Sequence, residues 1–413
     1  HDRGLTDRIH DRGLTDRWSA ASRRTATLRV RAKDSQTTGS FVCSRAVNLD
    51  VTDEWTRADA DVPDEAVREM VDELRPAWTV EDVERADEGT DFVATLDVAT
   101  PTAARRVVLK ATTNDWIDAE VARAEPRLLE RVGRETTIPV PDVYGYCDAH
   151  DALPTPFSLM EHVPGEALEG RADVLDEDAI ARVVQDAGEN LAALHELGTL
   201  PAPGTVGVRD GDLAVLDTDD NPRYENGLEK AREGCLEAID SLDDGGYFPG
   251  VTEDRERFAD LIPTLREHVE RTVPTLAPAD EPRYCHWDYR FGNLLVDPGS
   301  GATNAVLDWA NLSAAEPASN LASVEFHLLD ADDPDDATLD ARRRTFRDAY
   351  ASARDADWAF TDAVRERMAF YEFCERVGAM ACFGLWHEDA APSEREAIEA
   401  DHRVFVRDRC RDS

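Results

Sequence analysis

Two short apolar segments near residue 300 constrain the fold more than any other part of the sequence. They flank a turn rich in Pro, Gly and Ser over residues 298–303, a pattern typical of a β-hairpin. Asn293 opens the first segment and Asp308 closes the second. In an antiparallel hairpin these two ends lie side by side. An amide oxygen and a carboxylate are hard ligands that suit Mg²⁺, so we expect a metal-binding site at this end of the hairpin.

The loop before the hairpin adds two polar residues at fixed spacing. His286 and Asp288 precede Asn293 by seven and five positions. Asp288 lies on the loop that leads into the first strand, so its carboxylate can face the same space as Asn293. His-x-Asp-x-x-x-x-Asn followed by a metal-binding Asp is the catalytic-loop layout of protein-kinase-like folds. The pattern therefore favours phosphoryl transfer, with Asp288 as a candidate catalytic residue.

With this layout, and with a hydrophobic run that ends in Asp308 and a Trp, the chain resembles the aminoglycoside phosphotransferase family, also described as choline/aminoglycoside kinase-like. The resemblance covers roughly residues 80–390. It implies an α+β, two-lobed protein-kinase-like fold, with a small β-rich N-lobe and a larger helical C-lobe. It also implies that Asp288 is the general base for a substrate hydroxyl and that His286 supports the loop by hydrogen bonding. Asn293 and Asp308 would hold Mg²⁺ on the nucleotide phosphates.

A lysine occupies the end of a predicted strand over residues 105–110. The chain contains only three lysines, so the position of Lys110 is informative. A kinase-like fold needs a cation there against the α- and β-phosphates, whereas the alternative is a lysine that extends from the strand end to solvent. The resemblance implies that Lys110 pairs with a glutamate of the next helix. Glu125 is the first choice and Glu120 the second.

A turn precedes the strand pair that ends at Lys110. The predicted hairpin of residues 92–98 and 105–110 brings Gly89 and Thr90 close to that lysine. The resemblance implies that the loop covering the nucleotide phosphates lies here. This segment contains one glycine, so a plain turn is nearly as well supported.

The segment from Leu159 to Gly165 resembles the connector between the lobes of the family. The resemblance implies that backbone groups of Glu161 and Val163 read the adenine and that Met160 lines its pocket. A plain interlobe linker is compatible with the same residues.

Three further residues bear on the catalytic loop. Trp287 stands where the family usually has Gly, and Asn320 where it often has an Asp that supports the loop. His195, in a Leu-His pair on a predicted helix, is interpreted as a core or loop-supporting residue. Neither departure removes a group that phosphoryl transfer needs.

The chain divides into three predicted segments. Residues 1–50 carry a net positive charge and contain a repeated octapeptide, so we expect a disordered or spurious extension. Residues 51–162 form the expected N-lobe with the nucleotide-binding sheet. Residues 163–413 form the expected C-lobe with the catalytic loop and the acceptor site. Within that lobe the sequence predicts strands only at residues 293–308.

Charge and cysteine usage narrow the function classes. The 87 acidic and 46 basic residues give a net charge of −41, which disfavours nucleic-acid and membrane partners. An acidic chain with three lysines indicates a halophile, where molar salt screens the repulsion, and an acidic binding surface is the alternative. The seven scattered cysteines form no C-x-x-C pair, so a reducing cytoplasm is expected.

These observations lead to one main hypothesis and several alternatives. We expect a kinase that uses ATP, or alternatively GTP, with Mg²⁺ to phosphorylate a hydroxyl of a small molecule. A non-catalytic nucleotide-binding regulator, a kinase for a protein or larger metabolite, and a metal-dependent hydrolase are the alternatives. An acidic cleft would favour a cationic acceptor such as an amino sugar or an amino alcohol.

Overall fold

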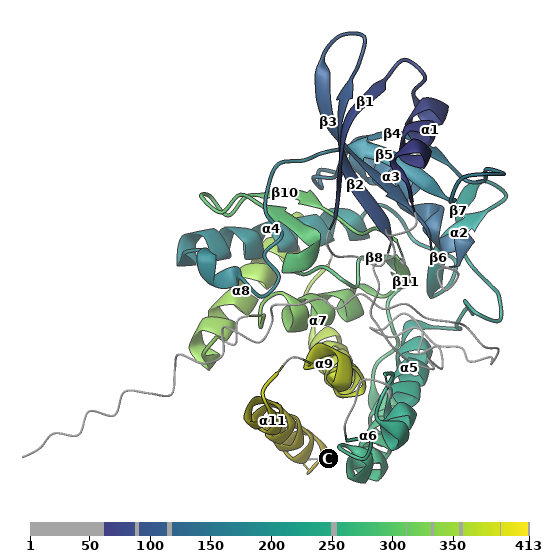
Figure 1. Cartoon of the computed structure of the whole chain (residues 1–413). Coiled ribbons are helices and arrows are strands. Elements are labelled where there is room, and N and C mark those ends of the chain that lie inside the picture. Colours follow the sequence, from purple (N-terminus) through teal and green to yellow (C-terminus); the bar gives the residue numbers. More distant parts are fainter. Residues whose placement is uncertain are drawn as a thin grey trace, which may run out of the picture.

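Figure 1 shows the computed structural model of the chain. The structure describes these residues: 62–86, 91–113, 118–248, 254–310, 312–331, 334–354, 358–388 and 390–411. The expected N-terminal extension, residues 1–50, lies outside this described part, as do Gly89 and Thr90. The segment boundaries at residues 50 and 162 stay predictions.

A five-stranded antiparallel sheet forms the smaller lobe, with strand order β1-β2-β3-β5-β4. Its strands are β1 (Thr79–Arg85), β2 (Phe92–Ala99), β3 (Ala104–Ala111), β4 (Val143–Cys147) and β5 (Phe157–Glu161). The helices that accompany it are α1 (Asp64–Leu74), α2 (Ala119–Ala122) and α3 (Ala124–Glu135). The predicted hairpin is present, because β2 and β3 pair in register from Phe92 opposite Ala111 to Ala99 opposite Ala104.

Alternation along β2 explains which face of this sheet is covered. Every second side chain from Phe92 to Val98 is buried, as a period of two requires. These side chains pack with the apolar stripe of α1, and Figure 1 shows that helix lying against the sheet. The apolar side chains of α3 join the larger core of the other lobe instead. Helix α3 is therefore held by both lobes, which matters for the site below.

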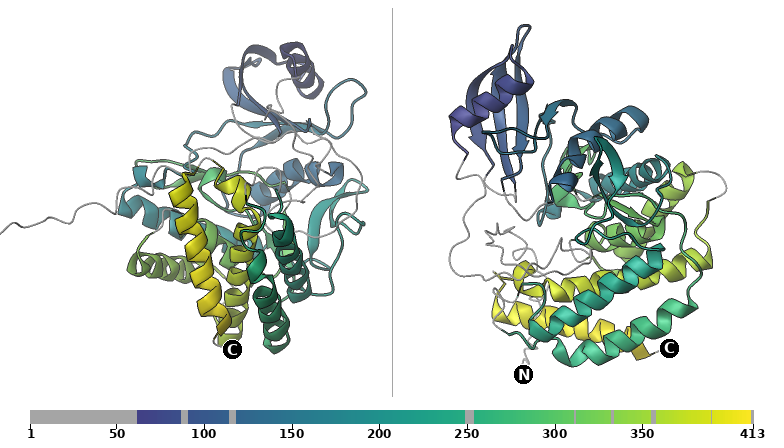
Figure 2. Two further views of the ribbon diagram at one scale, coloured as in Figure 1. Left: turned by 60° about the horizontal axis from the view of Figure 1, so that its bottom comes forward. Right: turned by 90° about the vertical axis from the view of Figure 1, so that its right-hand side faces the viewer.

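The larger lobe is mainly helical and lies below the sheet in Figure 1. Its helices are α4 (Glu177–His195), α5 (Gly227–Ser241), α6 (Ile262–Thr272), α7 (Pro317–His327), α8 (Asp336–Ala353), α9 (Asp362–Ala381), α10 (Phe383–Trp386) and α11 (Pro392–Arg411). Both views of Figure 2 show the C-terminal helices packed at the end of the molecule away from the sheet. Among the residues described, no helix has the length and apolarity needed to span a membrane.

The larger lobe also contains more strands than the sequence predicts. The expected hairpin forms as β9 (Leu294–Val296) and β10 (Thr303–Val306). A four-stranded sheet of order β7-β6-β11-β8 is added, from β6 (Gly204–Arg209), β7 (Asp212–Val215), β8 (Arg283–Cys285) and β11 (Ser313–Ala315). The prediction of strands only at residues 293–308 was therefore wrong. Strands β8 and β11 have three residues each, too few to show a period of two, and pairing with distant segments defines them.

The added strands position the catalytic loop. Strand β8 ends at Cys285, directly before His286, and pairs with β11, which leads into α7. The loop over residues 286–290 is thus anchored at its start by a sheet and at its end by the hairpin. The two lobes and their strand order establish the expected α+β, two-lobed kinase-like fold.

Candidate active site

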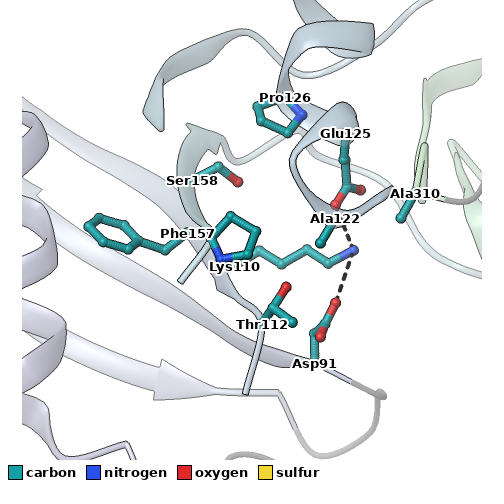
Figure 3. A pocket seen from close by; sticks show the side chains of 10 residues that line it. Asp91, Lys110, Thr112, Ala122, Glu125, Pro126, Phe157, Ser158 and Ala310 are labelled. Carbon is teal, nitrogen blue, oxygen red and sulfur yellow. Dashed lines mark ion pairs between the residues drawn. The ribbon is translucent and has the colours of Figure 1, made fainter. Parts of the chain in front are cut away.

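Lys110 lies in a pocket between the two lobes. Its Nζ is 2.8 Å from Oε2 of Glu125 on α3, and Figure 3 shows the two side chains pointing at each other. Oδ1 of Asp308 lies 3.6 Å from the same nitrogen, and Oδ2 of Asp91 lies 3.8 Å from it. The structure therefore joins Lys110 to its expected partner Glu125 and adds Asp308 and Asp91, whose contacts with this lysine sequence reasoning missed.

Three carboxylates determine the charge of this lysine. Only 19% of the Lys110 side chain is exposed, and burial by itself would lower the pKa of its ammonium group. The carboxylates of Glu125, Asp308 and Asp91 outweigh burial and hold the pKa above its ordinary value. Lys110 is consequently a permanent cation over the whole physiological pH range.

The local chain path explains why Glu125 is the partner. The helical segment breaks at Arg123 into α2 and α3, so Glu125 and Pro126 fall in the first turn of α3. A proline is tolerated in a first turn because its missing N–H would have no partner inside the helix. Glu120, the second choice, lies 3.5 Å from Arg123 and is largely exposed. Glu125 is 9% exposed at its side chain, so it supplies a desolvated carboxylate to Lys110.

The hairpin brings Asn293 and Asp308 together as expected. The N–H of Leu307 donates to the carbonyl of Asn293 at 2.8 Å, which extends the β9–β10 pairing by one step. Asp308 then has a φ of 58°, in the left-handed region. Asp tolerates this conformation better than most residues, at a cost of about 1 kcal/mol. The turn brings the carboxylate of Asp308 to Lys110 across the cleft.

Asp288 is held by two neighbours on its own loop. Nδ2 of Asn293 donates to Oδ2 of Asp288 at 2.7 Å and to the Asp288 carbonyl at 2.9 Å. Nε of Arg290 donates to Oδ1 of Asp288 at 2.6 Å, and its Nη1 lies 3.0 Å from Oε2 of Glu169. Burial opposes the charge of Arg290, but these two carboxylates outweigh it and raise the pKa of the guanidinium.

Arg290 is a second site residue that sequence reasoning missed. Its signal was present in the motif, because it follows Asp288 by two positions and is a cation in an acidic chain. Sequence alone does not show whether such a side chain turns toward the loop or toward solvent. The structure places its guanidinium between Asp288 and Glu169, 26% exposed.

His286 links the loop to the hairpin. Its imidazole is buried, and Nε2 lies 2.9 Å from the carbonyl of Leu307, so Nε2 carries the proton and donates. The ring also packs edge-on against Trp309. The structure thus gives His286 the supporting hydrogen bond that the sequence analysis expected, directly before Asp308.

Asn320 on α7 holds the same loop through two hydrogen bonds to the backbone of His286. Its Oδ1 accepts the N–H of His286 at 3.1 Å, and its Nδ2 donates to the carbonyl of His286 at 2.8 Å. Nε2 of His195 lies 3.2 Å from the same Oδ1, so it donates, and Nδ1 then accepts from the hydroxyl of Tyr350 at 2.7 Å. An amide at position 320 therefore makes two backbone bonds of opposite polarity, which a carboxylate could not.

The surroundings of His195 favour the uncharged imidazole that its two hydrogen bonds require. Burial, reinforced by Arg354 and Arg283, lowers the pKa of His195 to about 3.

A second α7 residue, Ser323, donates its side-chain hydroxyl to the carbonyl of Trp287 at 2.8 Å. The unusual Trp287 is therefore accommodated in a loop whose backbone is held at two successive residues.

The interlobe connector packs against the hairpin. Gly165, at a φ of +147°, approaches so closely that a Cβ there would lie 2.9 Å from Cβ of Leu295. Asn304 donates its side-chain amide to the carbonyl of Pro164 at 2.9 Å. The connector and the β9–β10 hairpin are thus in direct contact.

The residues expected to read the nucleotide base lie on this connector and on the strand before it. Met160 and Glu161 are the last two residues of β5, and Val163 follows them. The N–H of Glu161 donates to the carbonyl of Asp142 at 2.8 Å, which occupies that donor. Other residues line the pocket around Lys110, among them Thr112, Ser158 and Ala310. The three residues expected to read the base are not among those that line this pocket.

The donor set at the hairpin end fits a magnesium ion. Among the described residues, the side-chain amide of Asn293 directs its Nδ2 at Asp288, and no hydrogen bond uses its Oδ1. That oxygen and the carboxylate of Asp308 form a two-ligand set, which suits Mg²⁺ bound jointly with phosphates. Within the described part of the chain, no group of three or more His, Cys, Asp or Glu residues could hold a metal by itself.

Two lobes of this topology, with an interlobe lysine and a loop of this form, define a kinase-like protein. Residues 74–371, well over half of the chain, match the profile of the phosphotransferase enzyme family, APH. The chain therefore belongs to the phosphotransferase enzyme family. No curated protein matches its sequence.

Solved structures share the fold at low sequence identity. A candidate aminoglycoside phosphotransferase of Ralstonia eutropha JMP134 is 18% identical, with a TM-score of 0.51, over 84% of this chain and 96% of that one. APH(2″)-IIIa, solved with GDP and kanamycin, is 15% identical, with a TM-score of 0.52, over 82% of this chain and 98% of that one. At such identities the likeness establishes the fold, and the chemistry has to be argued from this chain's own residues.

Proposed function

We propose that this protein transfers the γ-phosphoryl group of ATP, or alternatively GTP, to a hydroxyl of a small molecule. The observation that carries the proposal is the cation Lys110, held 2.8 Å from Glu125 and 3.6 Å from Asp308 between the lobes. A buried lysine braced by a helix carboxylate is what a kinase-like fold uses to hold nucleotide phosphates. The hairpin connects this lysine with the loop that carries Asp288, because Asp308 at one hairpin end contacts Lys110 and Asn293 at the other bonds to Asp288.

Asp288 is the proposed general base. Its carboxylate accepts the proton of the acceptor hydroxyl as the oxygen forms a bond to the γ-phosphorus. The bond between the γ-phosphorus and the bridging oxygen breaks, and the nucleoside diphosphate leaves with that electron pair. Arg290 and Asn293 fix the direction of the carboxylate through bonds of 2.6 and 2.7 Å. Phosphoryl transfer depends chiefly on such positioning and on charge neutralisation.

Asn293 and Asp308 are the proposed ligands of Mg²⁺. When bound, the ion would neutralise charge on the phosphate oxygens. The hairpin supplies the amide oxygen and the carboxylate from adjacent backbone positions, and His286 holds the second position through the carbonyl of Leu307. His286 is thus a positioning residue in this proposal.

Nucleotide base recognition and acceptor choice complete the proposal. Backbone groups near Glu161 and Val163, with Met160, are proposed to face the base. The GDP and kanamycin in the structure of APH(2″)-IIIa support a nucleotide donor and a small acceptor. An acidic chain favours a cationic acceptor, such as an amino sugar or an amino alcohol.

The test is a panel of small hydroxyl compounds incubated with the full chain, ATP or GTP, and Mg²⁺ in molar KCl. We expect one or more compounds to be phosphorylated, with formation of one nucleoside diphosphate per product. The Asp288→Asn variant should form product at least about 10²-fold more slowly than wild type while still binding nucleotide. A wild-type chain that binds neither ATP nor GTP would overturn the proposal. Binding without transfer to any compound would favour the non-catalytic regulator.

A further inference from the structure

Asp91 lies beside the proposed phosphate-binding lysine. It immediately precedes β2, and the β2–β3 register sets Val93 opposite Lys110, so Asp91 lies diagonally across the strand pair. Its side chain is 7% exposed, and Oδ2 lies 3.8 Å from Nζ of the lysine. Figure 3 shows its carboxylate on the opposite side of that nitrogen from Glu125. Asp91 therefore faces the cation from within the same pocket.

The three carboxylates around Lys110 differ in how tightly they hold it. Glu125 is at hydrogen-bond distance, 2.8 Å, and comes from the anchored helix α3. Asp308 has a proposed role as a metal ligand. Oδ2 of Asp91 lies 3.8 Å from Nζ of Lys110, beyond hydrogen-bond distance and the longest of the three contacts, so of these three it is the one that a stronger anion replaces most easily.

Charge makes this contact relevant to nucleotide binding. Among the described residues, one ammonium group faces three carboxylates, so these four groups together carry a formal charge of −2 before any ligand arrives. Like charges a few ångströms apart repel strongly where water is largely excluded. Incoming phosphates must therefore replace Asp91 as a partner of Lys110, and the nearby Asp91 carboxylate still repels them after they bind.

We propose that Asp91 is an electrostatic gate: its carboxylate occupies Lys110 in the free protein and opposes the nucleotide phosphates, so that it weakens nucleotide binding. This inference rests on the proposed function. The opposition grows with the charge of the ligand, so ATP is affected more than ADP, and adenosine not at all. A residue that only supported the fold would not produce this ranking.

The experiment compares ATP, ADP and adenosine binding to the full chain by calorimetric titration in molar KCl with Mg²⁺. Asp91→Asn keeps the side-chain shape and removes the charge. We expect ATP to bind about threefold to tenfold tighter, with a smaller gain for ADP and no change for adenosine. Asp97→Asn is the matched control, because Asp97 is an exposed aspartate of the same strand β2. It should leave all three affinities unchanged.

Asp91→Ser provides a second variant that also removes the charge, and thermal unfolding checks that each protein is folded. Equal or weaker ATP binding by folded Asp91 variants would overturn the gate, since weaker binding would mean that the carboxylate assists the ligand. A gain that is the same for ATP and adenosine would also overturn it. If the wild-type chain binds no nucleotide, the proposed function fails together with the gate, whereas wild-type binding without an Asp91 effect rejects the gate alone.

Discussion

The side-chain amide of Asn293 donates to the carboxylate of Asp288, with 2.7 Å between Nδ2 and Oδ2. This bond fixes the orientation of the amide, since its nitrogen faces the base and its oxygen faces away. One residue therefore couples the proposed base to the proposed metal site.

Replacement of Asp288 by Asn should separate chemistry from binding. The amide cannot accept the hydroxyl proton, so kcat should fall by about 10²–10⁴. The Kd for nucleotide should stay within about twofold, because Lys110 and Asp308 are untouched. Steady-state kinetics and nucleotide titration check both values, with Asp297→Asn in the exposed hairpin turn as the control. Wild-type turnover by Asp288→Asn would exclude Asp288 as the base.

Replacement of Lys110 by Met should weaken nucleotide binding about 10- to 100-fold, because a charged hydrogen bond to phosphate is worth about 1.5–3 kcal/mol.

The effect of Lys110 on nucleotide binding should not depend on pH, because the raised pKa of Lys110 keeps its ammonium group charged in the folded state. Its contribution to stability is therefore complete below its unfolded pKa and is lost only as pH rises through the still higher folded pKa. Titrations at pH 6, 7.5 and 9 should show equal contributions from Lys110, given as the affinity ratio of wild type to variant. A ratio that falls toward pH 9 would contradict this.

The second described lysine, Lys230, should behave in the opposite way. It is buried on α5, its ammonium group donates to Ser313, and burial lowers its pKa to about 8. Between pH 8 and about 10.5 the unfolded chain binds more protons, so Lys230 makes stability rise with pH. Lys230→Met should raise the free energy of unfolding at pH 7 by about 1–3 kcal/mol and abolish that rise.

Denaturant unfolding at pH 7, 8.5 and 10 measures both effects of the Lys230 change. Lys110→Met is the matched control, because it removes a lysine whose pKa is raised and should destabilise the chain. A Lys230→Met protein less stable than wild type at pH 7 would contradict the prediction.

Asn320→Asp should damage the catalytic loop although Asp is common at this place in the family. The new carboxylate cannot donate to the His286 carbonyl, and two acceptors would then face each other in a buried site. A loss of about 1–3 kcal/mol in unfolding free energy is expected, together with a lower kcat. Asn304→Asp loses an amide-to-carbonyl bond at an exposed site and should change both values little. Wild-type stability of Asn320→Asp would show that the amide donor is dispensable.

Gly165→Ala should disturb the connector beyond the effect of its backbone angle. Gly165 and Gly198 have φ values of +147° and +141°, but a Cβ at Gly198 meets nothing within 4 Å. Gly198→Ala therefore measures the conformational cost alone. Gly165→Ala adds a clash with Leu295 and should be less stable by a further 1–3 kcal/mol or so. Chemical unfolding of both variants gives the difference in unfolding free energy. Equal losses of unfolding free energy would mean that the connector moves enough to avoid the clash with Leu295.

Several strands could not be predicted because they depend on distant partners. β8 and β11 have three residues each, all of them buried except the half-buried Arg283, so their sequences show no alternation. β1, at the edge of the sheet, has a burial pattern without a clear apolar face. Alternation in β2 was readable because one of its faces is buried under α1. Periodicity predicts a strand where one face is buried and fails where pairing alone defines it.

The amino-acid sequence by itself determined the hairpin of Asn293 and Asp308, the loop spacing of Asp288, and the exceptional place of Lys110 in a lysine-poor chain. These features depend on turn residues, apolar runs and composition, which act locally along the backbone. Only the tertiary structure decided which charges besides Glu125 meet Lys110. Asp91 and Asp308 are 217 positions apart, the difference of their residue numbers, yet both face Lys110. Such contacts form because the lobes bury charged groups together, and each buried charge then requires a partner that no local pattern names.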